Sequence, residues 1–191
     1  MKPRYVLAAL SFALSVTADD GARLLRLDHY VQVRSGVPAI AGQNTQIYVR
    51  EVVEAATVLR GGPAQDRVAL FIHGAGTPAE VAFDVPYQDD SWMAYLAHAG
   101  FDVFSMDMTG YGRSARPAAM NDPCNLARAQ QAAYVPMLIP TLCDPSYPHQ
   151  MTTLASDWQD IDGVVNHVRA LRHVDKLNLL AWSLGVAKSQ I

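Results

Sequence analysis

The residues best suited to chemistry lie near the end of the sequence, in the stretch LNLLAWSLG. Ser183 follows an apolar segment typical of a buried strand, and a helix is expected after it. Ala181 and Gly185 lie two positions before and after the serine, and small residues there allow a tight turn from strand to helix. A serine held on such a turn is typically a nucleophile. The spacing therefore predicts a nucleophilic Ser183, with alanine in place of the usual glycine at position 181.

A second candidate is the glycine-rich turn HGAG at residues 73–76, directly after the apolar segment VALFI. Acyl transfer passes through an oxyanion that backbone N–H groups stabilise, and glycine lets the backbone approach a substrate closely. An ordinary loop would have the same composition. For His73 we expect a role in the hydrogen bonding of this turn, or that of a buried structural histidine, and not the role of catalytic base.

The turn DMTGYGRS at residues 107–114 follows another apolar segment. Its glycines suggest a weak nucleotide-binding loop, but the full G-x-G-x-x-G pattern is absent. A Pro-rich stretch follows instead of a helix, so no helix N-terminus is available for a phosphate group. We therefore expect a tight polar turn here and no phosphate site.

The segments around these turns alternate between strand and helix. Continuous apolar runs indicate strands buried in a parallel sheet, whereas 91–100 and 156–174 have apolar residues at helical spacing. We expect Ser91 to cap the first helix and Ser156 to form a capping box with Gln159 in the second. The first two strands are expected to pair antiparallel. The expected strands are 28–35, 45–53, 67–74, 101–107 and 176–182.

In this order the segments resemble the α/β-hydrolase family. The resemblance extends over about residues 28–191 and rests on FIHGAG, SWMAYLAHAG, FDVFSMDMTGYGRS, the 156–174 helix and LLAWSLG. It implies an α/β fold with a mostly parallel sheet, helices on both faces and antiparallel first strands. By position it implies that Ser183 is the nucleophile and that the backbone N–H groups of Ala75 and Leu184 form the oxyanion hole. The supporting loop residues would be His73, Gly74, Gly76 and Gly185.

A serine nucleophile in this family implies acyl chemistry on a small carboxylic ester, lactone or thioester, without cofactor or metal. Family members carry the triad acid and histidine after the nucleophile, and residues 184–191 contain neither. We therefore expect the sequence to be the N-terminal part of a longer hydrolase, inactive by itself, whose last strand forms an exposed sheet edge. The alternatives are a non-catalytic binding or interaction protein of this fold, or a peroxidase-like or carbon–carbon bond hydrolase.

The regular pattern is interrupted at about residues 114–151, which contain six of the eleven prolines and both cysteines. We expect an irregular insertion with at most a short helix, serving either as a flap over the site or as surface decoration. Cys124 and Cys143 would form a disulfide in an oxidising compartment, and two free thiols are the alternative. The sequence has no CxxC motif or close Cys/His cluster, so we do not expect a metal site.

Residues 1–18 have the layout of a signal peptide: Lys2 and Arg4, an apolar run, and small residues before a cleavage site after Ala18. We expect a secreted or periplasmic protein with its domain at 19–191. The apolar run is too short to span a bilayer, so no stable membrane span is expected after its removal. The composition, half apolar and 17% charged, suits a globular protein. A net charge of −3 with no basic run argues against nucleic-acid binding.

Overall fold

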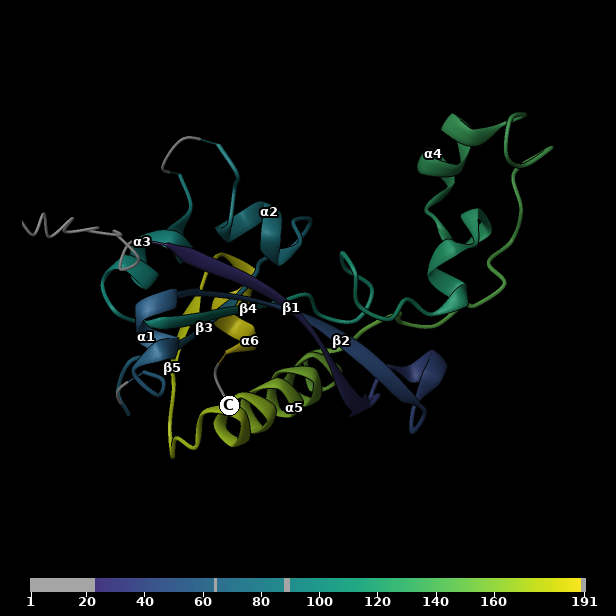
Figure 1. Ribbon diagram of the computed structural model, residues 1–191. Coiled ribbons are helices and arrows are strands. Elements are labelled where there is room, and N and C mark those ends of the chain that lie inside the picture. The colour runs from purple at the N-terminus through teal and green to yellow at the C-terminus, as the bar shows by residue number, and fades with distance from the viewer. Residues whose placement is uncertain (1–22, 64, 88–89, 190–191) are drawn as a thin grey trace, which may run out of the picture.

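The computed structural model describes residues 23–63, 65–87 and 90–189. These residues form a mixed five-stranded sheet with helices on both faces, and an arm extends away from one end of it (Figure 1). The strand order is β1-β2-β4-β3-β5. The structure confirms the predicted α/β architecture with antiparallel first strands. The expected signal peptide lies outside the described residues.

The strands differ in how they pair. β1 pairs with β2 and β2 with β4, both antiparallel, whereas β3 lies between β4 and β5 and is parallel to both. Every residue of β3 and β4 is buried because helices cover the sheet from both sides, which explains their continuous apolar runs. The strands are β1 (Leu24–Arg34), β2 (Asn44–Glu54), β3 (Val68–Ile72), β4 (Asp102–Met106) and β5 (Asn178–Ala181).

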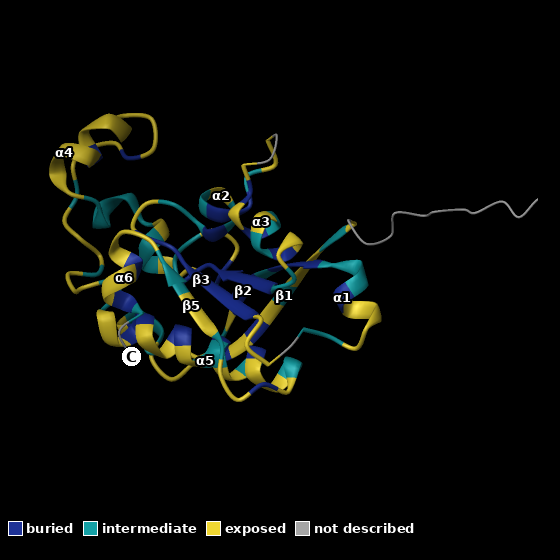
Figure 2. Ribbon diagram, turned by 90° about the vertical axis from the view of Figure 1, so that its left-hand side faces the viewer, coloured by how far each residue is buried: buried dark blue, intermediate teal, exposed yellow. Residues whose placement is uncertain are grey.

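Two apolar clusters hold the helices on the sheet, one on each face (Figure 2). On one face, α5 (Leu154–Arg172) buries Ile161, Val164 and Val168 against the strands. The opposite face is covered by α2 and α3, whose Phe83, Met93 and Ala97 pack around Phe71. The other helices are α1 (Ala55–Leu59), α2 (Ala79–Phe83), α3 (Trp92–His98), α4 (Arg128–Gln131) and α6 (Leu184–Lys188).

The helix starts follow local hydrogen bonding. Ser91 caps α3 as predicted, because its hydroxyl accepts the N–H of Ala94 at 3.0 Å. The predicted capping box of α5 is wrong. The helix begins one turn earlier, where Thr153 and Ser156 exchange side-chain and backbone bonds of 3.0 and 2.9 Å. Both serine and threonine accept such bonds, so the sequence offered two overlapping starts and the chain uses the first.

β5 is the outermost strand of the described sheet on its side. Its first two residues, Asn178 and Leu179, are exposed, and Leu180 and Ala181 are half-buried. The strand is also shorter than the predicted 176–182. The apolar sequence of this segment predicts a strand buried on both faces. That prediction is wrong for the part of the chain that the structure describes, and β5 instead matches the expectation of an exposed sheet edge.

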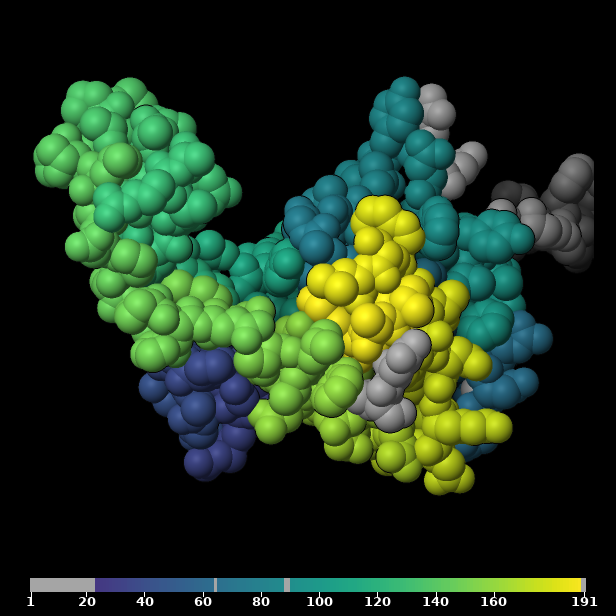
Figure 3. Space-filling model, turned by 180° about the vertical axis from the view of Figure 1, so that it is seen from behind, coloured from purple at the N-terminus to yellow at the C-terminus, as the bar shows by residue number. Residues whose placement is uncertain are grey.

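Most of the predicted insertion at residues 114–151 forms the arm, which stands apart from the body of the molecule (Figure 3), whereas Ser114 at its start is buried in the body. It contains α4 and three short 3₁₀ turns, with Cys124 and Cys143 joined in a disulfide whose Cα atoms are 5.3 Å apart. Within the described ranges, no helix combines the length and hydrophobicity that a bilayer crossing requires. The 3₁₀ turns of the arm are Ala118–Asn121, Pro123–Asn125 and Ala132–Tyr134, and a further one at Pro38–Ile40 links β1 to β2.

Candidate active site

Ser183 lies on a sharp turn between β5 and α6. Its backbone has φ 55° and ψ −127°, a conformation that residues other than glycine rarely adopt. Two hydrogen bonds close the turn: Trp182 N–H donates to the carbonyl of Ile72 at 3.2 Å, and Gly185 N–H donates to the carbonyl of Trp182 at 2.9 Å. Ser183 is exposed at the surface. The sequence therefore forms the strained strand-to-helix turn that presents a serine hydroxyl to solvent.

Glycine is required on two sides of this turn. A Cβ atom on Gly185 would lie 2.5 Å from the carbonyl oxygen of Ile72 and 2.8 Å from that of His73. A Cβ atom on Gly74 would lie 2.8 Å from the Cβ and 3.3 Å from the Oγ of Ser183. The HGAG turn therefore packs directly against the serine, and this close contact is what the two glycines allow. Ala181 is half-buried and packs against the core of the α5 face.

The predicted oxyanion donors are the backbone N–H groups of Ala75 and Leu184. Leu184 is the first residue of α6, where backbone N–H groups have no partner within the helix. Ala75 follows Gly74, the glycine in contact with Ser183. No hydrogen bond of the described residues uses either N–H group. Both donors are thus free to bind an oxyanion, and their role remains a prediction.

His73 is fully buried and uses both ring nitrogens to join two turns. Nε2 accepts the N–H of Met108 at 3.1 Å, and Nδ1 lies 2.6 Å from the carbonyl oxygen of Gly74. Burial lowers the pKa of His73, which favours the neutral ring with its proton on Nδ1. The ring packs against Tyr111 with centroids 4.5 Å apart. With both nitrogens bound, His73 supports the turn beside Ser183 and is not available as a base.

Asp107 fixes the neighbouring DMTGYGRS turn. Its carboxylate accepts the N–H of Ala79 at 2.7 Å and that of Arg113 at 2.9 Å. Ser114 donates to the carbonyl of Asp107 at 2.5 Å and accepts the N–H of Tyr48 at 2.8 Å. These side chains use their polar groups within the protein, so the turn is a structural support for the site.

A buried ion pair below the serine turn was not predicted. Lys188, in the last turn of α6, lies 3.1 Å from the carboxylate of Asp157 in α5, and both residues are only 5% exposed. Next to this pair, Asp160 accepts the N–H of Thr109 at 2.9 Å, and burial raises the pKa of Asp160 to about 6. In the sequence, the feature that could have indicated this group is the pair Asp157 and Asp160, which lie three residues apart on the buried side of α5. The ion pair ties the helix that follows Ser183 to α5.

No described histidine side chain is hydrogen-bonded to Ser183. His29 pairs with Glu51, His98 with Glu54, and His149 packs against Tyr147 in the arm. The predicted nucleophile thus has no general base among the described residues. They also contain no cluster of three or more His, Cys, Asp or Glu side chains that could bind a metal.

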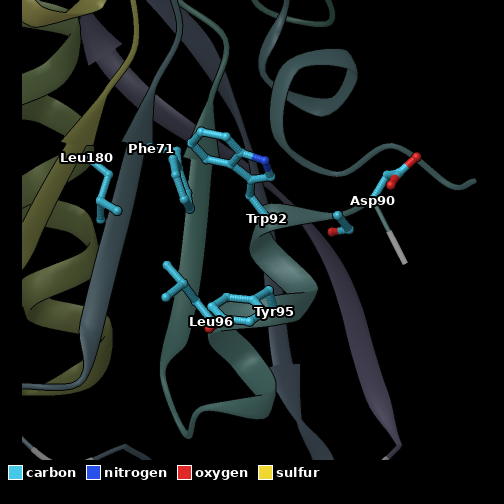
Figure 4. Close-up of a pocket in the computed structure, with 7 residues that line it drawn as sticks. Phe71, Asp90, Trp92, Tyr95, Leu96 and Leu180 are labelled. Carbon is cyan, nitrogen blue, oxygen red and sulfur yellow. The ribbon is translucent and has the colours of Figure 1, made fainter. Parts of the chain in front are cut away.

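Two hollows lie near the end of β5. One, of about 350 Å³, is lined by Thr77, Val81, Ala82, Phe83, Trp92 and Trp182. The other, of about 640 Å³, lies between α3 and β5 and does not include Ser183 (Figure 4). Phe71, Trp92, Tyr95, Leu96 and Leu180 form most of its apolar lining. Ser183 lines neither hollow, but Trp182, the residue before it, lines the first, which is therefore the better candidate for binding an apolar group.

No protein-family model matches the sequence, and no curated protein does. Among solved structures, the chain is similar to an epoxide hydrolase of Vigna radiata, with 14% identity and a TM-score of 0.44 over 84% of this chain and 32% of that one. It is similar to a protein described as an aryl esterase of Burkholderia cenocepacia, with 19% identity and a TM-score of 0.44 over 85% and 39% of the two chains.

A third similar structure is 2-hydroxy-6-oxo-6-phenylhexa-2,4-dienoate hydrolase of Rhodococcus sp. strain RHA1, with 16% identity and a TM-score of 0.44. The match covers 86% of this chain and 41% of that one. The chain thus spans 32 to 41% of the length of these three proteins.

Proposed function

We propose that the protein is a serine hydrolase that cleaves a carboxylic ester or lactone through an acyl-enzyme intermediate. One observation carries the proposal: Ser183 holds a strained, exposed turn at the end of a strand, with the glycine-rich HGAG turn packed against its side chain. This arrangement places a hydroxyl group and two free backbone N–H groups on adjacent turns. Such an arrangement suits attack on a carbonyl carbon.

In the proposed reaction, the hydroxyl oxygen of Ser183 attacks the carbonyl carbon and its proton passes to a histidine. The N–H groups of Ala75 and Leu184 stabilise the oxyanion until the alcohol leaves with the proton. Water then releases the acid in a second round of the same steps. We assign the histidine and the acid that orients it to positions after the nucleophile, as the family resemblance implies. Residues 184–191 contain neither.

The surroundings of the serine favour a substrate with an apolar group. Trp182, the residue before Ser183, lines the first hollow together with Phe83, and the rest of its lining is also mostly apolar. Burial of an apolar acyl or alcohol group there would contribute to binding. We also propose that the protein is exported, and the disulfide in the arm agrees with an oxidising compartment.

Labelling with a fluorophosphonate, which reacts with activated serines, tests the proposal. We expect the product of the complete reading frame to be labelled and the Ser183→Ala variant to remain unlabelled. Ser189→Ala, which removes another serine near the same helix, should label normally. The 191-residue chain by itself should hydrolyse 4-nitrophenyl butyrate no faster than its Ser183→Ala variant. Labelling that persists in Ser183→Ala would refute the assignment of the nucleophile.

A non-catalytic binding protein of the same fold is the second candidate. The observation in its favour is that no described histidine side chain is hydrogen-bonded to Ser183. The same labelling experiment separates the two candidates. A complete protein that carries a histidine and an acid after residue 191, yet does not label, would support the binding protein and contradict the hydrolase.

A further inference from the structure

The arm carries exposed apolar side chains that the proposed chemistry does not use. Four large residues near the disulfide are exposed: Met137 by 82%, Leu138 by 67%, Leu142 by 45% and Tyr134 by 38%. We call these four residues the apolar tip. Large apolar groups grouped on the surface of an ordered element mark a site of contact with another molecule or a membrane.

The apolar tip belongs to an ordered turn. The N–H groups of Leu138 and Ile139 both donate to the carbonyl of Tyr134, at 2.8 and 3.3 Å. Ile139 is only 6% exposed, so this turn buries one apolar side chain and leaves Met137 and Leu138 outside. The exposure of the tip is therefore a property of the folded arm.

A buried glutamine holds the same part of the arm together. The Gln131 side chain is 1% exposed and its amide donates to the carbonyls of Cys124 and Leu126, both at 3.0 Å. Its oxygen accepts the N–H of Cys143 at 3.0 Å. Together with the disulfide, these bonds join the two segments of the arm that contain Cys124 and Cys143. The arm can thus present its apolar residues on a defined support.

A hollow adjoins the apolar tip. It measures about 340 Å³ and is lined by apolar Met120, Leu126, Tyr134 and Leu138, with Arg116 and Asp122 among its polar lining residues. A lining with an apolar part and a polar part fits a molecule that has a hydrocarbon chain and a polar head. Two of its residues, Tyr134 and Leu138, are also residues of the tip.

The size, shape and charge of the tip favour a lipid surface over a protein. A stable protein interface uses roughly 20–30 residues on each side, whereas the tip provides four large side chains, all from an arm that projects from the body (Figure 3). A lipid surface accepts a few inserted side chains without a matching shape. Residues 129–143 contain no charged residue, and the preceding Arg128 is paired with Asp144 at 2.6 Å. Insertion of the tip would therefore bury no charge.

We propose that the apolar tip inserts into a lipid surface, with the adjoining hollow taking up part of an acyl chain. This inference goes beyond the proposed hydrolase activity and does not depend on Ser183. Because the tip is uncharged, insertion should occur with zwitterionic as well as anionic lipids and should persist at high salt.

Hydrogen–deuterium exchange with phosphatidylcholine vesicles tests the proposal locally. We expect slower exchange in residues 134–142 when vesicles are added, at both low and high salt. The double variant Met137→Ser and Leu138→Ser should lose this protection and bind vesicles less tightly, on the order of tenfold or more. Both side chains are exposed, so the variant should fold as the parent does. Unchanged exchange in residues 134–142 of the parent would overturn the proposal.

Val58→Ser with Leu59→Ser provides the matched control, because these neighbouring residues of α1 are 46% and 80% exposed and lie away from the arm (Figure 1). This pair should leave the protection of the tip unchanged. Protection that requires anionic lipid and disappears in high salt would contradict apolar insertion. Dimerisation that is lost on substitution of the tip, with no protection by vesicles, would show that the tip binds a second copy instead.

Discussion

Ser183 has a strained backbone conformation that the surrounding residues hold in place. Its φ of 55° and ψ of −127° are accessible to glycine but unfavourable for serine. The turn persists because Trp182 and Gly185 are hydrogen-bonded on either side and the HGAG turn packs against it. Such strain, held in place by the surrounding structure, is what we expect if Ser183 is the nucleophile that we propose.

Ser183→Gly should therefore stabilise the fold relative to Ser183→Ala. Both variants remove the hydroxyl, but only glycine adopts the observed backbone conformation without strain. We expect a difference of about 1 kcal/mol in the free energy of unfolding, since the relief of strain exceeds the extra flexibility of glycine in the unfolded chain. Urea unfolding of the two variants measures this difference. Equal stabilities would mean that the turn relaxes when the serine is replaced.

At the residue scale, the sequence could identify the turn but not its support. Ser183, Ala181 and Gly185 were recognised because a tight turn leaves a local pattern of small residues. The ion pair of Lys188 with Asp157 leaves no such pattern, since a lysine near a helix end is usually exposed to solvent. That it is buried depends on how α6 packs on α5, which is long-range information.

At the element scale, α5 is tied to the sheet by a buried group of charges. Arg172, in its last turn, binds Glu51 of β2 and Asp102 of β4, with distances of 2.5 Å to each carboxylate. His29 of β1 lies 2.6 Å from Glu51. Burial, together with the neighbouring Glu51 carboxylate, raises the pKa of Asp102 to about 7. Two buried carboxylates thus share one arginine.

This arrangement predicts a pH-dependent stability that Asp102→Asn should remove. The pKa of Asp102 is higher in the folded than in the unfolded protein, so the folded state holds the proton more tightly. The resulting stability is fully present below about pH 4 and is lost as the pH rises to about 7. Asparagine cannot ionise, so the variant should gain in urea midpoint relative to the parent between pH 5 and pH 8.

Asp162→Asn, at an exposed position of α5, is the control for the removal of one carboxylate. If the urea midpoints of Asp102→Asn and the parent differ by the same amount at pH 5 and at pH 8, Asp102 is not the source of the pH dependence.

The elements themselves were largely predictable where burial dictates the pattern. β3 and β4 have every residue buried, and their continuous apolar runs identified them. The start of α5 was not predictable, because Thr153 and Ser156 both offer a cap and only one is used. The sequence predicted the arm only as an interruption of the strand–helix pattern. The side-chain bonds of Gln131 that hold the arm together leave no periodic pattern in the sequence.

At the scale of the whole molecule, β5 is the outermost strand on its side of the sheet that the described residues form. Leu179 of β5 is 36% exposed and Trp182, just after the strand, is 50% exposed. Unpaired strand edges with apolar side chains favour pairing between chains. The same edge borders the hollow between α3 and β5, which adds further exposed apolar surface.

The 191-residue chain should therefore self-associate through β5. Leu179→Lys places a charge on this strand and should shift the sedimentation profile toward monomer while lowering the free energy of unfolding by no more than about 1 kcal/mol. Leu59→Lys, at an 80% exposed position of α1, a helix that contacts β2, should leave the profile unchanged. Association that survives in Leu179→Lys would exclude β5 as the contact.

The strand order also has a consequence for how the chain is made. β3 pairs with β4 on one side but with β5 on the other, and β5 begins only at Asn178. During synthesis from the N-terminus, one side of this wholly apolar strand stays without its neighbour until residue 178 has left the ribosome. The arm and α5 are both translated within that interval. The nascent protein thus passes through a stage in which its most apolar strand is open to other chains, when protection by a chaperone would matter most.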